Sequence, residues 1–160
     1  MPTWFEDWLE AERSAQSLRI WSPTLVPGLL QTAEYAWALF LAGQTDTSDE
    51  AIDALVATRL DRQAIFDRAD PPDTVVVLDE AVLHRLIGSA QVMHDALVQV
   101  AEMSRWPYLV VQVVPAANGA NAGLGGAFDI AGADGSRTRC GWKASKTRPS
   151  RNDHLCGKRR

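Results

Sequence analysis

The first third of the chain repeats apolar positions with the period of an α-helix. Thr3 begins a Thr-x-x-Glu pattern typical of a capping box, and the spacing after it predicts a first helix ending near Arg19. Residues 20–26 combine β-branched side chains with a proline and are expected to be extended. A turn at residues 27–32 should lead into a short helix, which Gly43 ends.

A third helix is predicted from about Ser48 to Arg68, because two consecutive prolines just beyond stop it. At about 100° per residue, two polar side chains, Arg59 and Gln63, fall on the stripe that should be buried. The apolar members of that stripe are Ile52, Leu55, Val56 and Phe66. This helix is therefore the first place where polar chemistry is expected inside the protein.

The second half of the chain is typical of strands connected by helices. Residues 74–78 form an apolar run without alternation, residues 92–105 an amphipathic helix, and residues 108–114 a second β-rich run. A third strand is expected at residues 127–131. The helical crossover favours a parallel arrangement of the first two strands. The predicted fold is α+β, with a small mixed sheet of about three strands packed with about four to five helices.

The sequence changes character after a hairpin-turn signal at residues 133–136, which calls for a returning strand. No period-two pattern follows it. From Ser136 onward there are nine Lys or Arg residues and one acid, which leaves 7 basic and 19 acidic residues before it. We therefore predict one domain over residues 1–135, incomplete at its C-terminus, and a disordered basic tail over residues 136–160. The edge at residues 127–131 should then be unpaired.

Two origins of this tail stay open. One is a genuine disordered basic segment, which nucleic acid would attract. The other is a shifted reading frame: read one base earlier, the codons of Cys140 and Trp142 both encode Leu, Met or Val whatever the preceding base. One solution for residues 137–144 then reads Pro-Asp-Ala-Val-Arg-Val-Glu-Gly, a turn followed by an alternating strand. We favour the second origin, which sequencing the gene tests.

The composition of the chain excludes several classes of protein but indicates no particular chemistry. Apolar residues make up 46% and charged residues 22% of the chain, as in ordinary globular proteins. No apolar run is long enough to span a membrane, and the N-terminus does not resemble a secretory signal, so a cytoplasmic location is expected. The acidic first 135 residues lack the clustered positive charge that binding to nucleic acid requires.

Several blocks of sequence, taken together and in this order, resemble one family. They are Val-Pro-Gly-Leu-Leu-Gln-Thr at residues 26–32 with Glu-Tyr-Ala at 34–36, Arg59-x-x-Arg62-Gln63, Val-Leu-Asp-Glu-Ala-Val-Leu at 77–83, Val-Gln-Val-Val-Pro at 111–115, and Gly126-x-Phe128. They are similar to the domain of unknown function that follows an N-terminal helix-turn-helix in XRE-type transcription regulators of actinomycetes. The likeness runs from about residue 4 to residue 135.

The resemblance implies a non-catalytic regulatory domain of a helix-turn-helix transcription regulator. It implies a protein partner, either a small regulatory protein or a second copy of the chain, with a small-molecule effector as an alternative. Family members normally begin with the DNA-binding helix-turn-helix, whereas this chain opens on the second domain. We therefore expect no specific DNA binding by the chain itself. Relatives also continue past Ser136 with a Val-x-Val-Glu strand, which the shifted frame restores.

The candidate binding residues are Gln31, Arg59, Arg62, Gln63 and Glu80. A buried guanidinium must be paired, and Glu80 at the end of an apolar strand is the natural partner of Arg59, with Arg62 nearer the rim. The favoured interpretation is an internal salt bridge in which Gln63 satisfies backbone groups. The alternative is a polar pocket that binds an effector or the backbone of a partner. Gln31 is expected mainly to bracket the turn.

Other patterns give weak signals. Glu80 and His84 have a spacing that suits a metal, but no third ligand is in register, so no metal or cofactor is expected. The glycine-rich stretch at residues 119–126 lacks phosphate-binding spacing. No catalytic residue is identified. Two alternatives to a regulatory domain stay open: a small enzyme using Glu80 with Arg59 and Arg62, and a purely structural dimerisation module with apolar patches on its N-terminal helices.

Overall fold

The structure is a computed structural model that describes residues 3–43, 47–132 and 138–142. Within these residues, the α-helices are α1 (Thr3–Arg13), α2 (Ala33–Gly43), α3 (Asp49–Asp61), α4 (Ala81–His84) and α5 (Ala90–Met103). The strands are β1 (Ser17–Ser22), β2 (Asp73–Asp79), β3 (Leu109–Val114), β4 (Phe128–Gly132) and β5 (Thr138–Trp142). Four 3₁₀ turns join them: η1 (Gly28–Leu30), η2 (Arg62–Asp67), η3 (Ala116–Asn118) and η4 (Ala122–Gly125).

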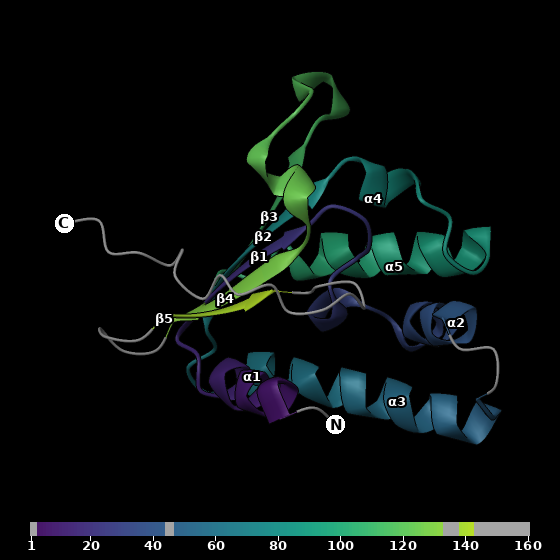
Figure 1. Ribbon diagram of the computed structural model, residues 1–160, viewed down its shortest axis with the longest axis horizontal. Coiled ribbons are helices and arrows are strands. Elements are labelled where there is room, and N and C mark those ends of the chain that lie inside the picture. Colours follow the sequence, from purple (N-terminus) through teal and green to yellow (C-terminus); the bar gives the residue numbers. More distant parts are fainter. Residues whose placement is uncertain (1–2, 44–46, 133–137, 143–160) are drawn as a thin grey trace.

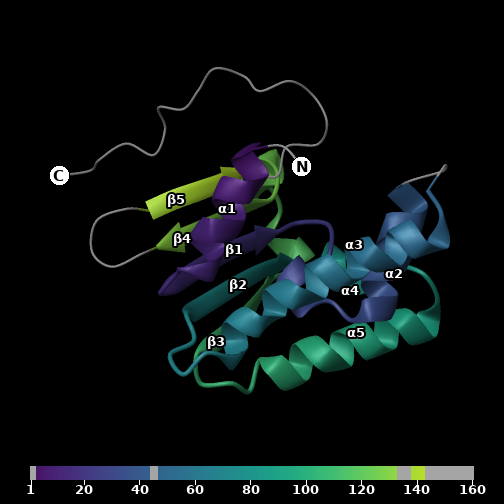
Figure 2. The ribbon, with the colours of Figure 1, turned by 90° about the horizontal axis from the view of Figure 1, so that it is seen from below.

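The strands form one mixed sheet in the order β3-β2-β1-β4-β5. The strands β1, β2 and β3 run parallel to one another. The strand β4 is antiparallel to β1, and β5 is antiparallel to β4. The α+β expectation of a small mixed sheet packed with helices is confirmed, as is the parallel pairing of β2 with β3 through a helical crossover. Figures 1 and 2 show the ribbon from two sides, with α1 passing over β4 and β5, which it contacts.

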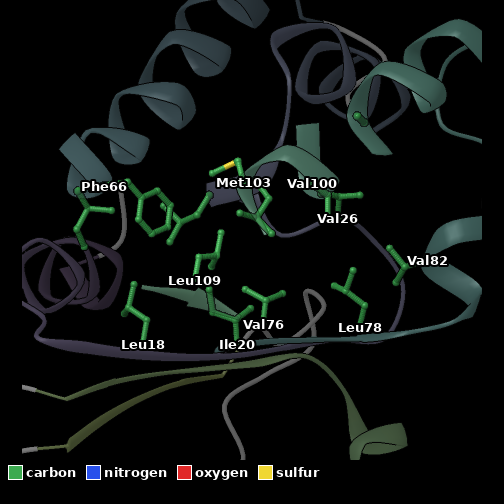
Figure 3. Close-up of a cluster of buried hydrophobic side chains, with 14 of the residues drawn as sticks. Leu18, Ile20, Val26, Phe66, Val76, Leu78, Val82, Val100, Met103 and Leu109 are labelled. Atoms are coloured by element: carbon green, nitrogen blue, oxygen red, sulfur yellow. The ribbon is translucent and has the colours of Figure 1, made fainter. Parts of the chain in front are cut away.

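The main hydrophobic core lies between one face of the sheet and the helices (Figure 3). Side chains alternate between the two faces of a strand, so β1 and β2 each contribute every second residue to it. The buried members from the strands are Leu18, Ile20, Val76, Leu78, Leu109 and Ala131, and Phe66, Val100 and Met103 cover them. Burying a Leu, Ile or Val side chain contributes about 1.5–3 kcal/mol, which makes this layer the main source of stability.

The centre of the sheet is β1, whose first three residues the sequence pattern assigned to the end of the first helix and whose last three it expected to be extended. The helix α1 ends at Arg13, not near Arg19. Leu18 and Ile20 point into the core with the period of two that a strand gives. The reason is tertiary: β1 pairs with β2 on one side and β4 on the other, and these hydrogen bonds outweigh a short stretch of helical spacing.

The strand β5 corrects a second expectation. A strand does follow residue 136, and it pairs with β4 in register from Gly132↔Thr138 to Phe128↔Trp142. The edge of β4 is therefore paired, and the expected domain end at residue 135 falls within this hairpin. Disorder was expected over residues 136–160, and it is wrong for residues 138–142, which form β5. Residues 143–160 lie outside the described residues, so the expected disorder there stays a prediction. The out-of-frame origin of the tail, which is argued from the codons of Cys140 and Trp142, also stays a prediction.

The glycine-rich stretch at residues 119–126 covers the other face of the sheet. The Trp21 indole Nε1–H donates a hydrogen bond to the Gly123 carbonyl, at 2.7 Å. A Cβ atom at Gly123 would overlap the Trp21 ring, so the backbone can approach the indole only because position 123 is glycine. The loop thus buries a tryptophan.

Candidate functional site

Four of the five predicted site residues meet in one place, around the turn that η1 makes. Gln31 follows η1, Arg59 belongs to the last turn of α3, and Arg62 and Gln63 begin η2. Together with Glu12 of α1, they form what we call the buried polar cluster. The prediction that Arg59 and Gln63 turn toward the inside of the protein holds, because both side chains reach the 26–31 turn.

The strongest interaction of the buried polar cluster is a bidentate ion pair between Arg62 and Glu12. Arg62 Nε and Nη2 donate to Glu12 Oε1 and Oε2 at 2.8 and 2.7 Å, and the two side chains are 13% and 4% exposed. Burial pulls the pKa of Arg62 down. The hydrogen bonds and charge of Glu12, with Asp129 further off, outweigh burial and raise that pKa. The guanidinium therefore stays charged, and its Nε and Nη2 groups are matched to the two oxygens of one carboxylate.

Arg59 occupies a different environment from Arg62. Its Nη1 donates to Gln31 Oε1 at 3.0 Å, and its guanidinium carbon lies 4.1 Å from the centre of the Phe40 ring. Burial and then the charge of Arg62 lower the pKa of Arg59. Within the described part of the chain, no carboxylate lies within salt-bridge distance of it. An amide and an aromatic face hold this cation instead of an anion.

The amide side chains tie the 26–31 turn to the rest of the molecule. Gln31 is buried and its Nε2 donates to the Val26 carbonyl at 2.7 Å, while Gln63 Nε2 donates to the Gln31 carbonyl at 2.7 Å. The Tyr35 hydroxyl accepts from the Val26 N–H at 3.1 Å, and burial raises the pKa of that phenol. The bracketing role expected of Gln31, and the backbone role expected of Gln63, are both what the geometry shows.

Glu80 lies apart from the buried polar cluster, so its expected pairing with Arg59 is wrong. It follows β2 and its Oε2 accepts a hydrogen bond from the Ala116 N–H at 2.7 Å. Its Oε1 is 3.5 Å from His84 Nε2, at the surface. The Ala116 hydrogen bond, followed by that of His84, lowers the pKa of Glu80. Glu80 thus joins the end of β2 to the turn after β3.

The residue that pairs with Arg62 could have been recognised from the sequence. Glu12 falls on the apolar stripe of the first helix, and an acid in that position signals a buried countercharge. Arg62, assigned to the rim, is the residue that Glu12 pairs with. Asp129 carried no sequence signal that separates it from a turn or surface acid, yet it is buried on β4 and acts on the charge of Arg62.

A groove lies between α2, α3 and the start of α5, and none of the residues of the buried polar cluster lines it. Helix α2 contacts both α3 and α5 (Figure 1), and the groove between them has a volume of about 610 Å³. It is open to solvent and mainly apolar, and its lining comprises Ala33, Glu34, Trp37, Ala38, Leu41, Ala42, Asp53, Val56, Gly88, Ser89 and Val92. None of these residues was predicted as a site.

The groove owes its shape to small residues. Gly88 has a φ of 66°, and a Cβ atom there would lie 3.1 Å from the Ala38 Cβ, so the approach to α2 needs glycine. Alanines on α2 leave room above the Trp37 ring and Leu41, which is 47% exposed. The lining includes two acidic residues, Glu34 and Asp53. The available signal was that α2 is apolar on nearly all sides.

No three His, Cys, Asp or Glu side chains among residues 3–43, 47–132 and 138–142 are grouped as metal ligands would be. No helix in the same ranges is both long and apolar enough to cross a membrane.

The comparisons with known proteins give one positive result. No curated protein and no solved structure matches the chain significantly. The sequence profile of a domain of unknown function, DUF5753, matches residues 5–146. That range contains every described helix and strand except the first residues of α1, and it reaches past residue 135 through β5. The chain therefore belongs to the DUF5753 family of domains of unknown function.

Proposed function

We propose that this chain is the non-catalytic regulatory domain of a cytoplasmic helix-turn-helix transcription regulator, and that its groove between α2, α3 and α5 binds the regulatory partner. The proposal is supported by the contrast between the buried polar cluster, whose side chains bond within the protein, and the groove, whose lining is open to solvent. In the buried polar cluster, Gln63 hydrogen-bonds the protein's own backbone and Arg62 hydrogen-bonds Glu12 within the cluster. The groove offers a ligand-sized, mainly apolar surface with exposed Leu41 and two carboxylates.

The kind of partner follows from the shape of the groove. Small-molecule sites enclose most of the ligand surface, whereas this groove is open along α2. Open apolar grooves between helices are typical of surfaces that receive a helix of another protein. A small protein partner is therefore favoured over an effector, and the carboxylates of Glu34 and Asp53 favour basic groups on that partner.

The enzyme alternative requires Glu80 beside Arg59 and Arg62 with a raised carboxyl pKa. Glu80 lies apart from both arginines, and its pKa is lowered by the Ala116 hydrogen bond and by His84. A general acid would need the opposite shift. These observations favour a binding role for the chain over acid–base chemistry.

A substitution in the groove tests the proposal in the source organism. Leu41→Asp places a charge on the apolar floor without emptying the core, because Leu41 is exposed. The matched control is Leu86→Asp, at a residue that is 64% exposed and outside the groove. We expect Leu41→Asp, but not the control, to change the same transcripts as deletion of the gene. Equal melting temperatures of both purified variants exclude a folding defect.

The proposal is overturned if deletion of the gene leaves the transcript profile unchanged, or if Leu41→Asp behaves like the wild type. DNA contact is assigned to a separate helix-turn-helix. A gel-shift assay with genomic fragments should therefore show no sequence-specific complex with the chain alone. Specific binding that survives removal of residues 143–160 would mean that this domain reads DNA itself.

A further inference from the structure

The outer edge of β3 presents unpaired backbone groups. Among the described strands, β3 is terminal and pairs only with β2. The Tyr108 and Val114 carbonyls accept hydrogen bonds from the Thr74 and Glu80 N–H groups, so even-numbered residues of β3 turn toward β2. Backbone groups alternate in direction along a strand, so Val111 and Val113 turn their N–H and C=O groups outward. The Leu109 N–H is already used by the Trp106 carbonyl, at 3.2 Å.

This edge lacks the features that protect natural sheet edges. The strand reads Leu-Val-Val-Gln-Val-Val, with no charge, no proline and no bulge. Eight large apolar side chains are exposed among the described residues, and two of them, Val110 and Val113, are on β3 itself. Figure 2 shows α5 running beside β3. The unpaired edge therefore carries exposed apolar side chains as well as unpaired backbone groups.

We propose that β3 pairs antiparallel with β3 of a second copy of the chain, about a two-fold axis that passes between their Gln112 residues. Such an axis stands perpendicular to the sheet and keeps corresponding faces on the same side. It places Val111 opposite Val113 of the second copy, and Val110 opposite Val114. Every valine of the edge then meets a valine, and the two Gln112 amides meet each other, where each amide offers both a donor and an acceptor.

Hydrogen bonding selects this register over its neighbour. With the axis at Gln112, Val111 and Val113 exchange all their outward N–H and C=O groups with the second copy. The next position sets Leu109, whose N–H is occupied, opposite Pro115, which has no N–H. No N–H donor is left unpaired at either end. An axis at Val111 would instead require the N–H of Leu109 and would set Val110 opposite Gln112.

The dimer edge and the groove are independent features. The groove is lined by Gly88, Ser89 and Val92 at the N-terminal end of α5 and by residues of α2 and α3, and no residue of β3 lines it. Burial of Val110 and Val113, which are 47% and 41% exposed, removes apolar surface from both faces of β3. Dimerisation therefore goes beyond the proposed regulatory function and does not rely on it.

Charge substitution at the two-fold axis tests the dimer. Sedimentation equilibrium of the full chain should show a monomer–dimer equilibrium. Gln112→Glu or Gln112→Lys alone sets like charges opposite each other and should raise the dissociation constant about fivefold or more. An equimolar mixture of the two variants pairs opposite charges and should restore dimerisation. Gln112 is exposed, so the melting temperature of the diluted chain should stay the same in all variants.

Matched controls separate this edge from other contacts. Gln91→Glu and Gln91→Lys, at an exposed position near the start of α5, should leave the dissociation constant unchanged. A wild-type chain that is monomeric at all concentrations overturns the proposal. A dimer that neither Gln112 substitution weakens, or two variants whose mixture is no tighter than each alone, also overturns it, because the subunits would then meet elsewhere.

Discussion

Glu12 and Arg62 show what a buried ion pair demands of its surroundings. Taking each charge out of water is costly, and only the matched, two-bonded geometry offsets that cost. Arg59, a few residues earlier, is held by an amide and an aromatic ring instead. The two arginines therefore belong to one cluster, but loss of a partner should affect the stability of the protein differently at each. Loss of a partner strands the charge of Arg62, whereas Arg59 can move outward along its long stem.

Removing one member of the ion pair should be far more damaging than removing both. We expect Glu12→Gln to lower the free energy of unfolding by about 3–5 kcal/mol, because an unpaired guanidinium stays buried. The double variant Glu12→Leu with Arg62→Met should recover most of that loss. Urea denaturation measures both, with Glu10→Gln on the exposed side of α1 as the control. A single-variant loss of less than about 1 kcal/mol would show that water reaches the pair.

Glu80 should titrate below its ordinary pKa of 4.5 in the folded protein. Since the folded pKa is the lower one, the carboxylate stabilises the fold above the unfolded pKa, and this contribution is lost as pH falls through the folded pKa. The Ala116 hydrogen bond is the largest cause, so Ala116→Pro, which removes the donor, should raise the pKa more than His84→Ala. NMR titration of the carboxyl carbon measures both. The reverse order would mean that His84 dominates.

At the scale of elements, the connection before α5 decides how closely α2 can approach. Gly88 adopts a left-handed conformation and touches Ala38 of α2. Ser89 then caps α5 by accepting a hydrogen bond from the Val92 N–H. These consecutive residues set one end of the groove and the start of α5. The groove is thus a consequence of how two helices are connected, not of a binding motif.

Gly88→Ala should therefore destabilise the protein and deform the groove. The left-handed conformation costs a side chain about 1–2 kcal/mol, and the 3.1 Å approach to Ala38 adds to this. Thermal unfolding is the measurement. Gly43→Ala, at the end of α2 with nothing within 4 Å of an added Cβ, is the matched control and should not destabilise the protein. Equal melting temperatures for both variants would show that the connection adjusts freely.

At the scale of the whole molecule, the sheet depends on its last strand. The strand β5 covers β4, and β4 in turn holds the buried Asp129 and Ala131. Loss of β5 would turn β4 into an open edge, as β3 already is on the opposite side. The C-terminal part of the chain therefore matters for folding up to Trp142.

Truncation should reveal this dependence. Ending the chain after Gly132 removes the whole pairing of β5 with β4, so we expect a lower free energy of unfolding and a tendency to aggregate. Ending it after Trp142 should leave the unfolding midpoint unchanged, because residues 143–160 are predicted to be disordered. Urea denaturation of both truncated chains measures this. A large loss on removing residues 143–160 would instead assign them a place in the fold.

The sequence by itself determined those helices and strands whose hydrophobic periodicity matches their surroundings in the fold. The sequence predicted the apolar runs of β2 and β3 and the amphipathic helix α5. It also predicted that Arg59 and Gln63 lie on the inner side of their helix. In each case the spacing of the residues agrees with which of them are buried. The buried charge on the third helix could also be predicted. Its chemistry fixes that a partner exists, though not which one.

Only the tertiary structure decided the rest. Residues 17–19 continue the helical spacing of the first helix, yet they begin the central strand because β2 and β4 supply hydrogen bonds on both sides. Glu12 pairs with Arg62, and Glu80 does not pair with Arg59 as expected, because packing brings α1, and not the end of β2, to this cluster. Pairing across the chain depends on contacts between distant residues, which no local period encodes. The groove and the open β3 edge arise in the same way.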